Sequence, residues 1–146
     1  MSDDAALLRW VADRTAIRDL VTRYAVAVDR KDWTAVRTCF TEDATCDYAW
    51  FQGDLPTVLG LIERGLAQFE STTHLVGNHL ADVAGDTASA ETYALCHHRL
   101  RTPAGVADRV AGLRYLDGLV RTPEGWRIRR RDVVVDWERV DPVEGA

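Results

Sequence analysis

The apolar residues change their spacing near Ser71, and this change constrains the possible folds more than any other feature of the sequence. Before it, apolar side chains between Thr15 and Val28 recur every three or four residues, which is the spacing of one buried helix face. After it, Thr, Val, Ile and Tyr become frequent and helix signals end. Helices followed by a run of strands indicate an α+β domain rather than a doubly wound parallel sheet.

Three helical segments are expected before this change. Their ranges are Thr15–Val28, Trp33–Phe40 and Leu55–Phe69. Leu7–Val11 forms earlier helical turns that are either continuous with the first helix or packed beside it. Asp32 suits the N-cap of the second helix, and Asp54 suits that of the third, where Pro56 fits the first turn.

Four long strands are expected after Ser71. Their ranges are Thr72–Val83, Thr87–Arg99, Asp108–Arg121 and Trp126–Trp137. The turns between them are short and contain Gly or Pro, so consecutive strands should pair antiparallel. A further short strand at Ala44–Tyr48 is expected at the edge of the sheet.

The predicted sheet should be strongly bent, because Gly112 and Gly118 lie in one of its strands. Helices packed across the concave face of a curved antiparallel sheet leave a cone-shaped cavity, which is either filled by side chains or open to a ligand. No linker or internal repeat interrupts the sequence, and 146 residues suit one core. We therefore expect a single domain over residues 1–146.

The charge of the chain argues against a nucleic-acid partner. Its net charge is −5 and its pI is near 5.3, whereas phosphate binding needs a basic face. One basic cluster occurs at Arg127–Arg131, within a strand pattern. We interpret it as the solvated face of a strand with one or two buried ion pairs.

Cysteine usage and the N-terminal segment suggest a cytoplasmic protein. Cys39, Cys46 and Cys96 make an odd number without a CxxC spacing, so neither a disulfide framework nor a zinc site is expected. The acidic start at Met1–Asp4 lacks the apolar segment of a signal peptide. No apolar run is long enough to span a membrane, so no membrane partner is expected.

Asp29 and His74 are the residues around which we expect any chemical site. Asp29 ends the first main helix at the border of its apolar face, where burial and the helix dipole would both raise its pKa toward that of a useful base. A solvated helix end is the alternative. His74 comes early in the first long strand, on a face with Thr72, Val76, Asn78 and Leu80.

The second long strand has one face of small residues that ends at His98. That face carries Ala88, Ala90, Thr92, Ala94, Cys96 and His98, and small side chains leave room for a ligand. His74, His98 and Asp29 could also form a metal site of two histidines and one carboxylate. No regular metal-ligand spacing supports that alternative, and we expect neither metal nor cofactor.

Between the second and third predicted helices, residues 46–51 are rich in aromatic side chains. Core packing is the ordinary role of such a cluster. The sharper hypothesis is that Tyr48, Trp50 and Phe51 form an aromatic pocket wall, with the Tyr48 phenol as a hydrogen-bond donor.

Several segments, in this order, resemble the SnoaL-like branch of the nuclear-transport-factor-2-like superfamily. They are residues 16–20 (AIRDL), 28–33 (VDRKDW), 39–44 (CFTEDA), 73–78 (THLVGN) and 124–128 (EGWRI). The resemblance covers nearly the whole chain and implies the cone-shaped fold. Within the superfamily, the chain is similar to scytalone dehydratase and lindane dehydrochlorinase, which are cofactor-free lyases with an Asp–His pair.

The resemblance also implies roles for individual residues. Asp29 and His74 match the family pair, Tyr48 resembles a substrate-orienting tyrosine, and His98 matches a second histidine if one gap is allowed. Val28 and Tyr115 depart from the dehydratase pattern, in which these positions hold a tyrosine and an asparagine. The expected substrate-binding residues are Tyr24, Trp50, Phe51, Cys96 and Tyr115.

We therefore expect a dehydratase-type lyase or isomerase that acts on a small cyclic substrate, such as a polyketide-derived ring. His74 would be the base, Asp29 would orient it, and Tyr48 and His98 would polarise a carbonyl or protonate a leaving group. The alternatives are a polyketide cyclase, a small subunit of a hydroxylating dioxygenase, and a non-catalytic module for ligand binding or dimerisation. A homodimer or homotrimer would pair through an outer sheet face carrying Tyr93, Arg127, Arg129 and Val133.

Overall fold

The computed structural model describes residues 3–143, so Met1, Ser2 and residues 144–146 of the expected domain lie outside the described part. Its helices are α1 (Asp3–Asp29), α2 (Trp33–Thr38) and α3 (Leu55–Ala67). Its strands are β1 (Phe40–Asp47), β2 (Gln52–Asp54), β3 (Ser71–Ala84), β4 (Thr87–Thr102), β5 (Gly105–Thr122) and β6 (Gly125–Val143). The predicted α+β order is confirmed.

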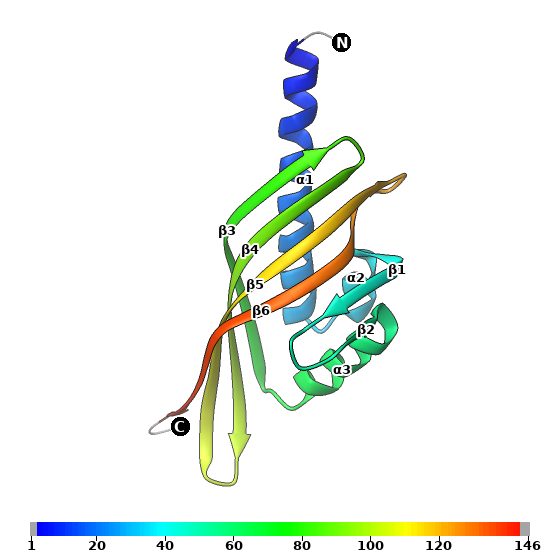
Figure 1. Cartoon of the computed structure of the whole chain (residues 1–146). Coiled ribbons are helices and arrows are strands. Elements are labelled where there is room, and N and C mark those ends of the chain that lie inside the picture. Colours follow the sequence, from blue (N-terminus) through cyan, green and yellow to red (C-terminus); the bar gives the residue numbers. More distant parts are fainter. Residues whose placement is uncertain (1–2, 144–146) are drawn as a thin grey trace.

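The strands form one six-stranded sheet in the order β2-β1-β6-β5-β4-β3. β3 to β6 form an antiparallel meander, and β1 pairs parallel to β6. The sheet curves around α1, while α2 and α3 lie beside its lower half (Figure 1). The helices therefore cover the concave face of the sheet, as expected for a cone.

α1 is one continuous helix, so the turns at Leu7–Val11 belong to it. Its second half is held by burial, since Ile17, Leu20 and Val21 are almost fully enclosed. Its first half is tied to the sheet by Asp13, which accepts hydrogen bonds from Nη1 and Nη2 of Arg121 at 2.7 and 2.8 Å. None of the helices within residues 3–143 is both long and apolar enough to cross a membrane.

The predicted N-caps are confirmed, but two helix ends differ from the prediction. Asp32 Oδ1 accepts from Ala35 N at 3.0 Å, and Asp54 Oδ1 accepts from Thr57 N at 2.9 Å. α2 ends at Thr38 and α3 at Ala67, so Phe40 and Phe69 lie outside helices. Phe40 instead begins β1, because its aromatic ring is buried in the sheet core.

α1 ends in a turn that normally uses glycine. Lys31 has a φ of 54°, its N donates to Val28 O at 2.9 Å, and Asp32 N donates to Ala27 O at 2.9 Å. A left-handed non-glycine residue costs about 1 kcal/mol. In return, Lys31 Nζ donates to Phe69 O at 3.2 Å and ties the end of α1, which carries Asp29, to the segment after α3.

Two of the predicted strand faces were wrong because the strands contain register shifts. The β3–β4 register shifts between Val76 and His79, so Ala81 is buried and Leu80 is 70% exposed. Asn78 and Leu80 therefore do not share the face of His74. In the β5–β6 pair a shift follows Gly118, and Val133 is buried rather than on the outer face.

The glycine prediction is confirmed, because both β5–β6 register shifts come directly after Gly112 and Gly118. The prediction for the short strand was only partly right. β1 begins earlier than expected, and it lies one strand in from the edge, which β2 occupies. Tyr48 follows β1, in a turn where its N donates to Phe51 O at 2.9 Å.

The basic cluster contains one fully buried cation, as expected. Arg131 donates from Nε and Nη2 to Oδ1 and Oδ2 of Asp117 at 2.7 Å each, and neither side chain is exposed. Arg129 and Arg130 lie on the solvated face. The Arg131 guanidinium also stacks on Tyr24 and Tyr115, with centroid distances of 4.1 and 4.2 Å.

Candidate active site

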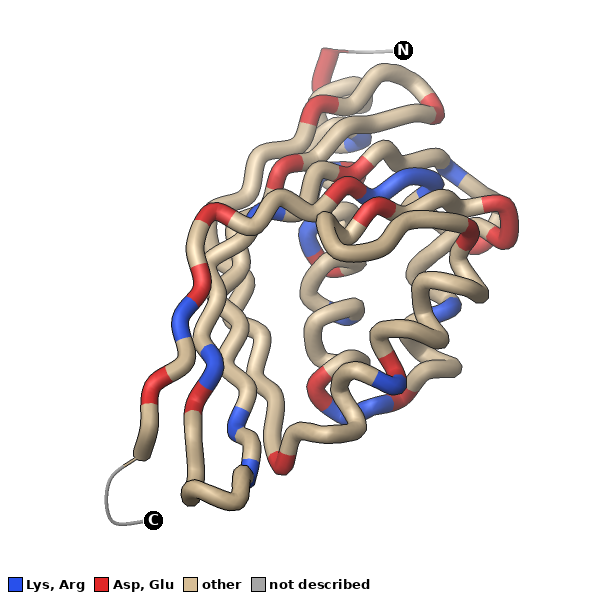
Figure 2. Tube along the Cα trace, turned by 60° about the horizontal axis from the view of Figure 1, so that its bottom comes forward, with Lys and Arg blue, Asp and Glu red and all other residues tan. Residues whose placement is uncertain are grey.

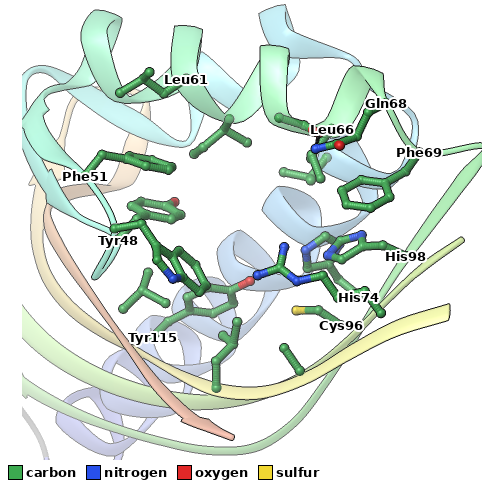
Figure 3. A pocket seen from close by; sticks show the side chains of 18 of the residues that line it. Tyr48, Phe51, Leu61, Leu66, Gln68, Phe69, His74, Cys96, His98 and Tyr115 are labelled. Atoms are coloured by element: carbon green, nitrogen blue, oxygen red, sulfur yellow. Dashed lines mark hydrogen bonds between the residues drawn. The ribbon is translucent and has the colours of Figure 1, made fainter. Parts of the chain in front are cut away.

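A cavity of about 160 Å³ lies between α3, the end of α1 and the concave face of the sheet. Figure 3 shows Leu61, Leu66 and Gln68 above it, with His74, Cys96 and His98 gathered on the opposite side. The full lining is Tyr24, Val28, Tyr48, Trp50, Phe51, Leu61, Ile62, Gly65, Leu66, Gln68, Phe69, His74, Cys96, His98, Arg109, Ala111, Leu113, Tyr115 and Val133. Most of these walls are apolar, which is usual for a small-molecule site.

Asp29 and His74 are joined by two hydrogen bonds. His74 Nδ1 donates to Asp29 Oδ1 at 2.6 Å, and the backbone N of His74 donates to Asp29 Oδ2 at 2.9 Å. The carboxylate therefore fixes both the ring and the strand that carries it. Because Nδ1 is bound to Asp29, Nε2 is the ring nitrogen that remains for the Cys96 side chain or for a ligand in the cavity, which the His74 ring lines.

The protonated form of His74 is strongly favoured. Burial lowers the pKa of His74, but the hydrogen bond to Asp29, a hydrogen bond with the Cys96 side chain and the nearby negative charge outweigh it and raise the pKa from 6.5 to about 9. The His74 side chain is only 8% exposed, so solvent screens these interactions little. A carboxylate behind an imidazole can thus hold an imidazolium inside the cavity.

His98 is held in the opposite protonation state. Burial and the nearby charges of His74 and Arg109 lower the pKa of His98 from 6.5 to about 4. Its Nδ1 lies 2.7 Å from Thr72 Oγ1 in a hydrogen bond, and its ring stacks on Phe69 at a centroid distance of 4.8 Å. The rings of His74 and His98 meet edge to face at 5.5 Å, so a charged and a neutral imidazole adjoin.

Three phenols complete the polar side of the cavity. The hydroxyls of Tyr24 and Tyr48 are hydrogen-bonded at 2.8 Å, and the Tyr24 ring packs edge to face on Tyr115 at 5.7 Å. Burial raises the pKa of all three phenols above the usual value, so they are neutral donors. Arg131 lies against two of these rings and places a cation behind them.

The structure brings all of the predicted site residues together. Tyr24, Tyr48, Trp50, Phe51, His74, Cys96, His98 and Tyr115 line the cavity, and Asp29 binds the ring of His74. Trp50 is the most exposed of them, at 54%, and lies at the mouth. Tyr48 and Phe51 stack with a centroid distance of 5.9 Å.

The sequence prediction missed Arg109, Thr72 and Phe69. Arg109 is the cross-strand partner of His98, and Thr72 is its partner on the other side. The alternation Arg109, Ala111, Leu113, Tyr115 along β5 was a signal that one face of this strand turns toward the cavity. Pairing registers were needed to place that face against His98.

The three residues of the alternative metal site are His74, His98 and Asp29. They are arranged as a hydrogen-bonded His74–Asp29 dyad with His98 beside it. Both oxygens of Asp29 accept hydrogen bonds from His74, and His98 Nδ1 is bound to Thr72. Across residues 3–143, no group of three or more His, Cys, Asp or Glu side chains is placed to hold a metal ion.

The profile of the SnoaL-like domain family matches residues 9–132 of the chain. Rv2910c, an uncharacterized protein of Mycobacterium tuberculosis, is 35% identical over 126 residues, which cover 83% of this chain and 84% of that protein. These matches agree with the resemblance drawn from the sequence segments.

Solved structures share the fold. One from Novosphingobium aromaticivorans, assigned as a scytalone dehydratase, superimposes with a TM-score of 0.78 at 20% identity and covers 99% of both chains. The hexachlorocyclohexane dehydrochlorinase LinA-type3 of Novosphingobium barchaimii gives a TM-score of 0.77 at 17% identity, with 95% of each chain covered. At these identities the likeness concerns the fold.

Proposed function

Because the chain belongs to the SnoaL-like domain family, we propose that it is a cofactor-independent lyase or isomerase acting on a small cyclic substrate. The observation that carries this proposal is the Asp29–His74 pair, whose ring lines an open cavity and whose Nδ1 is fixed at 2.6 Å from a carboxylate. An open cavity with this contact favours catalysis over a filled, purely structural cone.

In the proposed mechanism, Nε2 of neutral His74 removes a proton next to a carbonyl or β to a leaving group. Asp29 orients the ring and stabilises the imidazolium that forms. The electron pair of the broken C–H bond becomes either an enolate or a new double bond with loss of the leaving group. The same imidazolium then returns the proton for isomerisation or releases it after elimination.

In this proposal, Tyr48 and His98 act on the oxygen of the substrate. The Tyr48 hydroxyl lies 2.8 Å from that of Tyr24, so Tyr24 can donate to Tyr48 while Tyr48 donates to a carbonyl or leaving hydroxyl. Neutral His98, fixed by Thr72, offers the remaining ring nitrogen. Donors fixed before the reaction lower the energy of a developing negative charge.

The cavity size supports a substrate with a single ring. Its volume is about 160 Å³, and an apolar protein cavity of about 150 Å³ holds one benzene molecule. Tyr24, Phe51 and Leu66 supply apolar walls for such a ring. A polycyclic polyketide would have to leave most of its rings outside the mouth of the cavity. We therefore favour dehydration or isomerisation of a single ring, rather than polyketide cyclisation, as the reaction.

Proton exchange tests the base without knowledge of the natural substrate. Cyclohexanone and 4-oxocyclohexanecarboxylate would be incubated with the protein in D2O, and loss of the α-proton signals would be followed by NMR. We expect His74→Gln and Asp29→Asn each to slow the catalysed exchange by about 10²- to 10⁴-fold. Exchange at the wild-type rate in His74→Gln would overturn the assignment of the base.

His79→Gln is the matched control for His74→Gln. His79 lies on the same strand, and its Nδ1 is 2.8 Å from Thr92 Oγ1, but it does not line the cavity. We expect this variant to retain the exchange rate of the wild type. The rate should also rise with pH toward about 9, because at pH 7 only roughly 1 molecule in 100 carries neutral His74.

We also propose that copies of this chain associate through the outer face of the sheet. This face carries exposed apolar side chains at Leu75, Leu80, Tyr93, Leu95 and Trp137. Apolar side chains grouped on one face of a sheet favour association. Light scattering should give a dimer or trimer, and Leu80→Asp with Leu95→Asp should give a monomer; an unchanged mass would exclude this face.

A further inference from the structure

We propose that Arg109 selects the substrate: the cavity takes a single-ring compound that carries a carboxylate, and Arg109 binds that carboxylate at the mouth. The inference rests on the proposed function only in taking this cavity as the substrate site. It adds the charge of the substrate and the residue that recognises it.

Arg109 is positioned by the pairing of β4 with β5. It is the cross-strand partner of His98, and two residues along β5, Ala111 is the partner of Cys96. Arg109 and Ala111 both line the cavity, so the side chain of Arg109 lies on the same face as the two cavity residues of β4. The guanidinium stacks over Trp50 at 5.3 Å from the ring centroid, which holds it at the mouth.

The hydrogen-bonding capacity of Arg109 is mostly unused. Its Nη2 donates to Glu138 Oε2 at 2.6 Å, which is the one acceptor it reaches within residues 3–143. The side chains of Arg109 and Glu138 are 30% and 44% exposed. An ion pair this exposed contributes little to stability, so a ligand can share or replace it at low cost.

Two other arginines on this sheet, Arg99 and Arg114, are held differently. Arg99 donates from Nε and Nη2 to both oxygens of Asp108, at 2.8 Å each. Arg114 likewise donates to both oxygens of Asp136 and also to Glu91. Arg109 is thus bound by a single carboxylate oxygen, and it faces a cavity rather than the outer side of the sheet.

The side chains that line the cavity include no carboxylate, although the whole chain carries −5. Arg109 is the one guanidinium among them, and the carboxylates of Glu138 and Asp29 pair with Arg109 and His74 from outside the lining. Figure 2 shows Lys and Arg interleaved with Asp and Glu along the protruding strand ends near the C-terminus, so neither sign of charge dominates there. An apolar chamber with a guanidinium at its mouth fits a ring with one carboxylate, which arginine binds through two parallel hydrogen bonds.

The experiment compares benzoate with benzamide, which have the same ring and nearly the same shape but differ in charge. Binding of each would be measured by calorimetry to the wild-type chain, Arg109→Gln and Arg99→Gln. We expect the wild type to prefer benzoate, Arg109→Gln to lose that preference by about tenfold or more, and Arg99→Gln to keep it. Equal preference in Arg109→Gln and wild type would overturn the inference, as would binding of neither compound.

Two further arms separate this inference from the proposed function. His74→Gln removes the proposed base but keeps Arg109, so a retained preference for benzoate without proton exchange supports Arg109 independently of catalysis. Exchange of cyclohexanone and 4-oxocyclohexanecarboxylate at equal kcat/KM in the wild type would overturn the selection of carboxylates while the proposed function stands. Arg109→Lys should restore part of the preference, because it keeps the charge and loses the planar fork.

Discussion

Two aspartates inside this fold each bind one basic side chain, and they differ in what remains open around them. Asp117 and Arg131 are both fully buried and joined through two hydrogen bonds. Asp29 binds His74 through the ring and the backbone, but that ring lines a cavity. The closed pair reaches no solvent, whereas the ring of the open pair adjoins a cavity in which, in the proposed mechanism, it exchanges a proton with a ligand. Whether a charge pair serves folding or catalysis thus depends on its surroundings more than on its residue types.

Breaking the closed pair should have the largest effect on stability. Asp117→Ala leaves the Arg131 guanidinium buried without its carboxylate, and such a change costs about 3–5 kcal/mol of unfolding free energy. Urea denaturation measures this loss. The double variant Asp117→Leu with Arg131→Met should recover much of it, since two apolar side chains can replace a buried pair. A loss below about 1 kcal/mol in the single variant would show that the guanidinium does not depend on Asp117.

The open pair should make stability depend on pH above neutrality. Because folding raises the pKa of His74 from 6.5 to about 9, its contribution is fully present below pH 6.5 and is lost as pH rises through about 9. The shift corresponds to about 3 kcal/mol. Urea denaturation between pH 6 and pH 10 should show this decline in the wild type and in His79→Gln, but not in His74→Gln. An equal decline in His74→Gln would assign it to other groups.

The smallest expected effect is on the pKa values of His74 and His98 when a neighbouring side chain is removed. Cys96→Ala removes a side chain that hydrogen-bonds to His74, so the pKa of His74 should fall, though less than in Asp29→Asn. His74→Gln removes a positive charge beside His98, whose pKa should rise yet stay below 6.5 because burial is the larger cause. NMR titration of the two imidazoles measures both changes. A higher pKa of His74 in Cys96→Ala would contradict the assigned role of the thiol.

Much of the fold could be predicted because local patterns and turns agree with the tertiary structure. The strands, the two N-caps and the bend after Gly112 and Gly118 follow from residue types alone. The position of Val133 could not be predicted, because one extra residue in β6 reverses the alternation that places side chains on a face. Strand propensity carries no sign of that extra residue.

For the site, Asp29 was a candidate because it ends a helix, and His74 because it comes early in a strand. The family resemblance identified them as a pair. Sequence could not reveal that the Asp29 carboxylate also accepts the backbone N–H of His74, because that contact depends on how α1 crosses β3. It also could not place Arg109, whose neighbours His98 and Trp50 come from distant segments. Residue groups of this kind depend on the pairing of distant strands, which the periodicity of the sequence does not reveal.

The extra residues in the strands also decide where this chain can lose a residue without disturbing its strand pairing. Arg129 lies opposite no residue of β5, and two residues of β3, Gly77 and Asn78, face one residue of β4. Removing one residue at either place would leave the flanking pairs in step while straightening the sheet. The loss of a single residue at either place would therefore flatten the chamber of this chain while every lining side chain keeps its face.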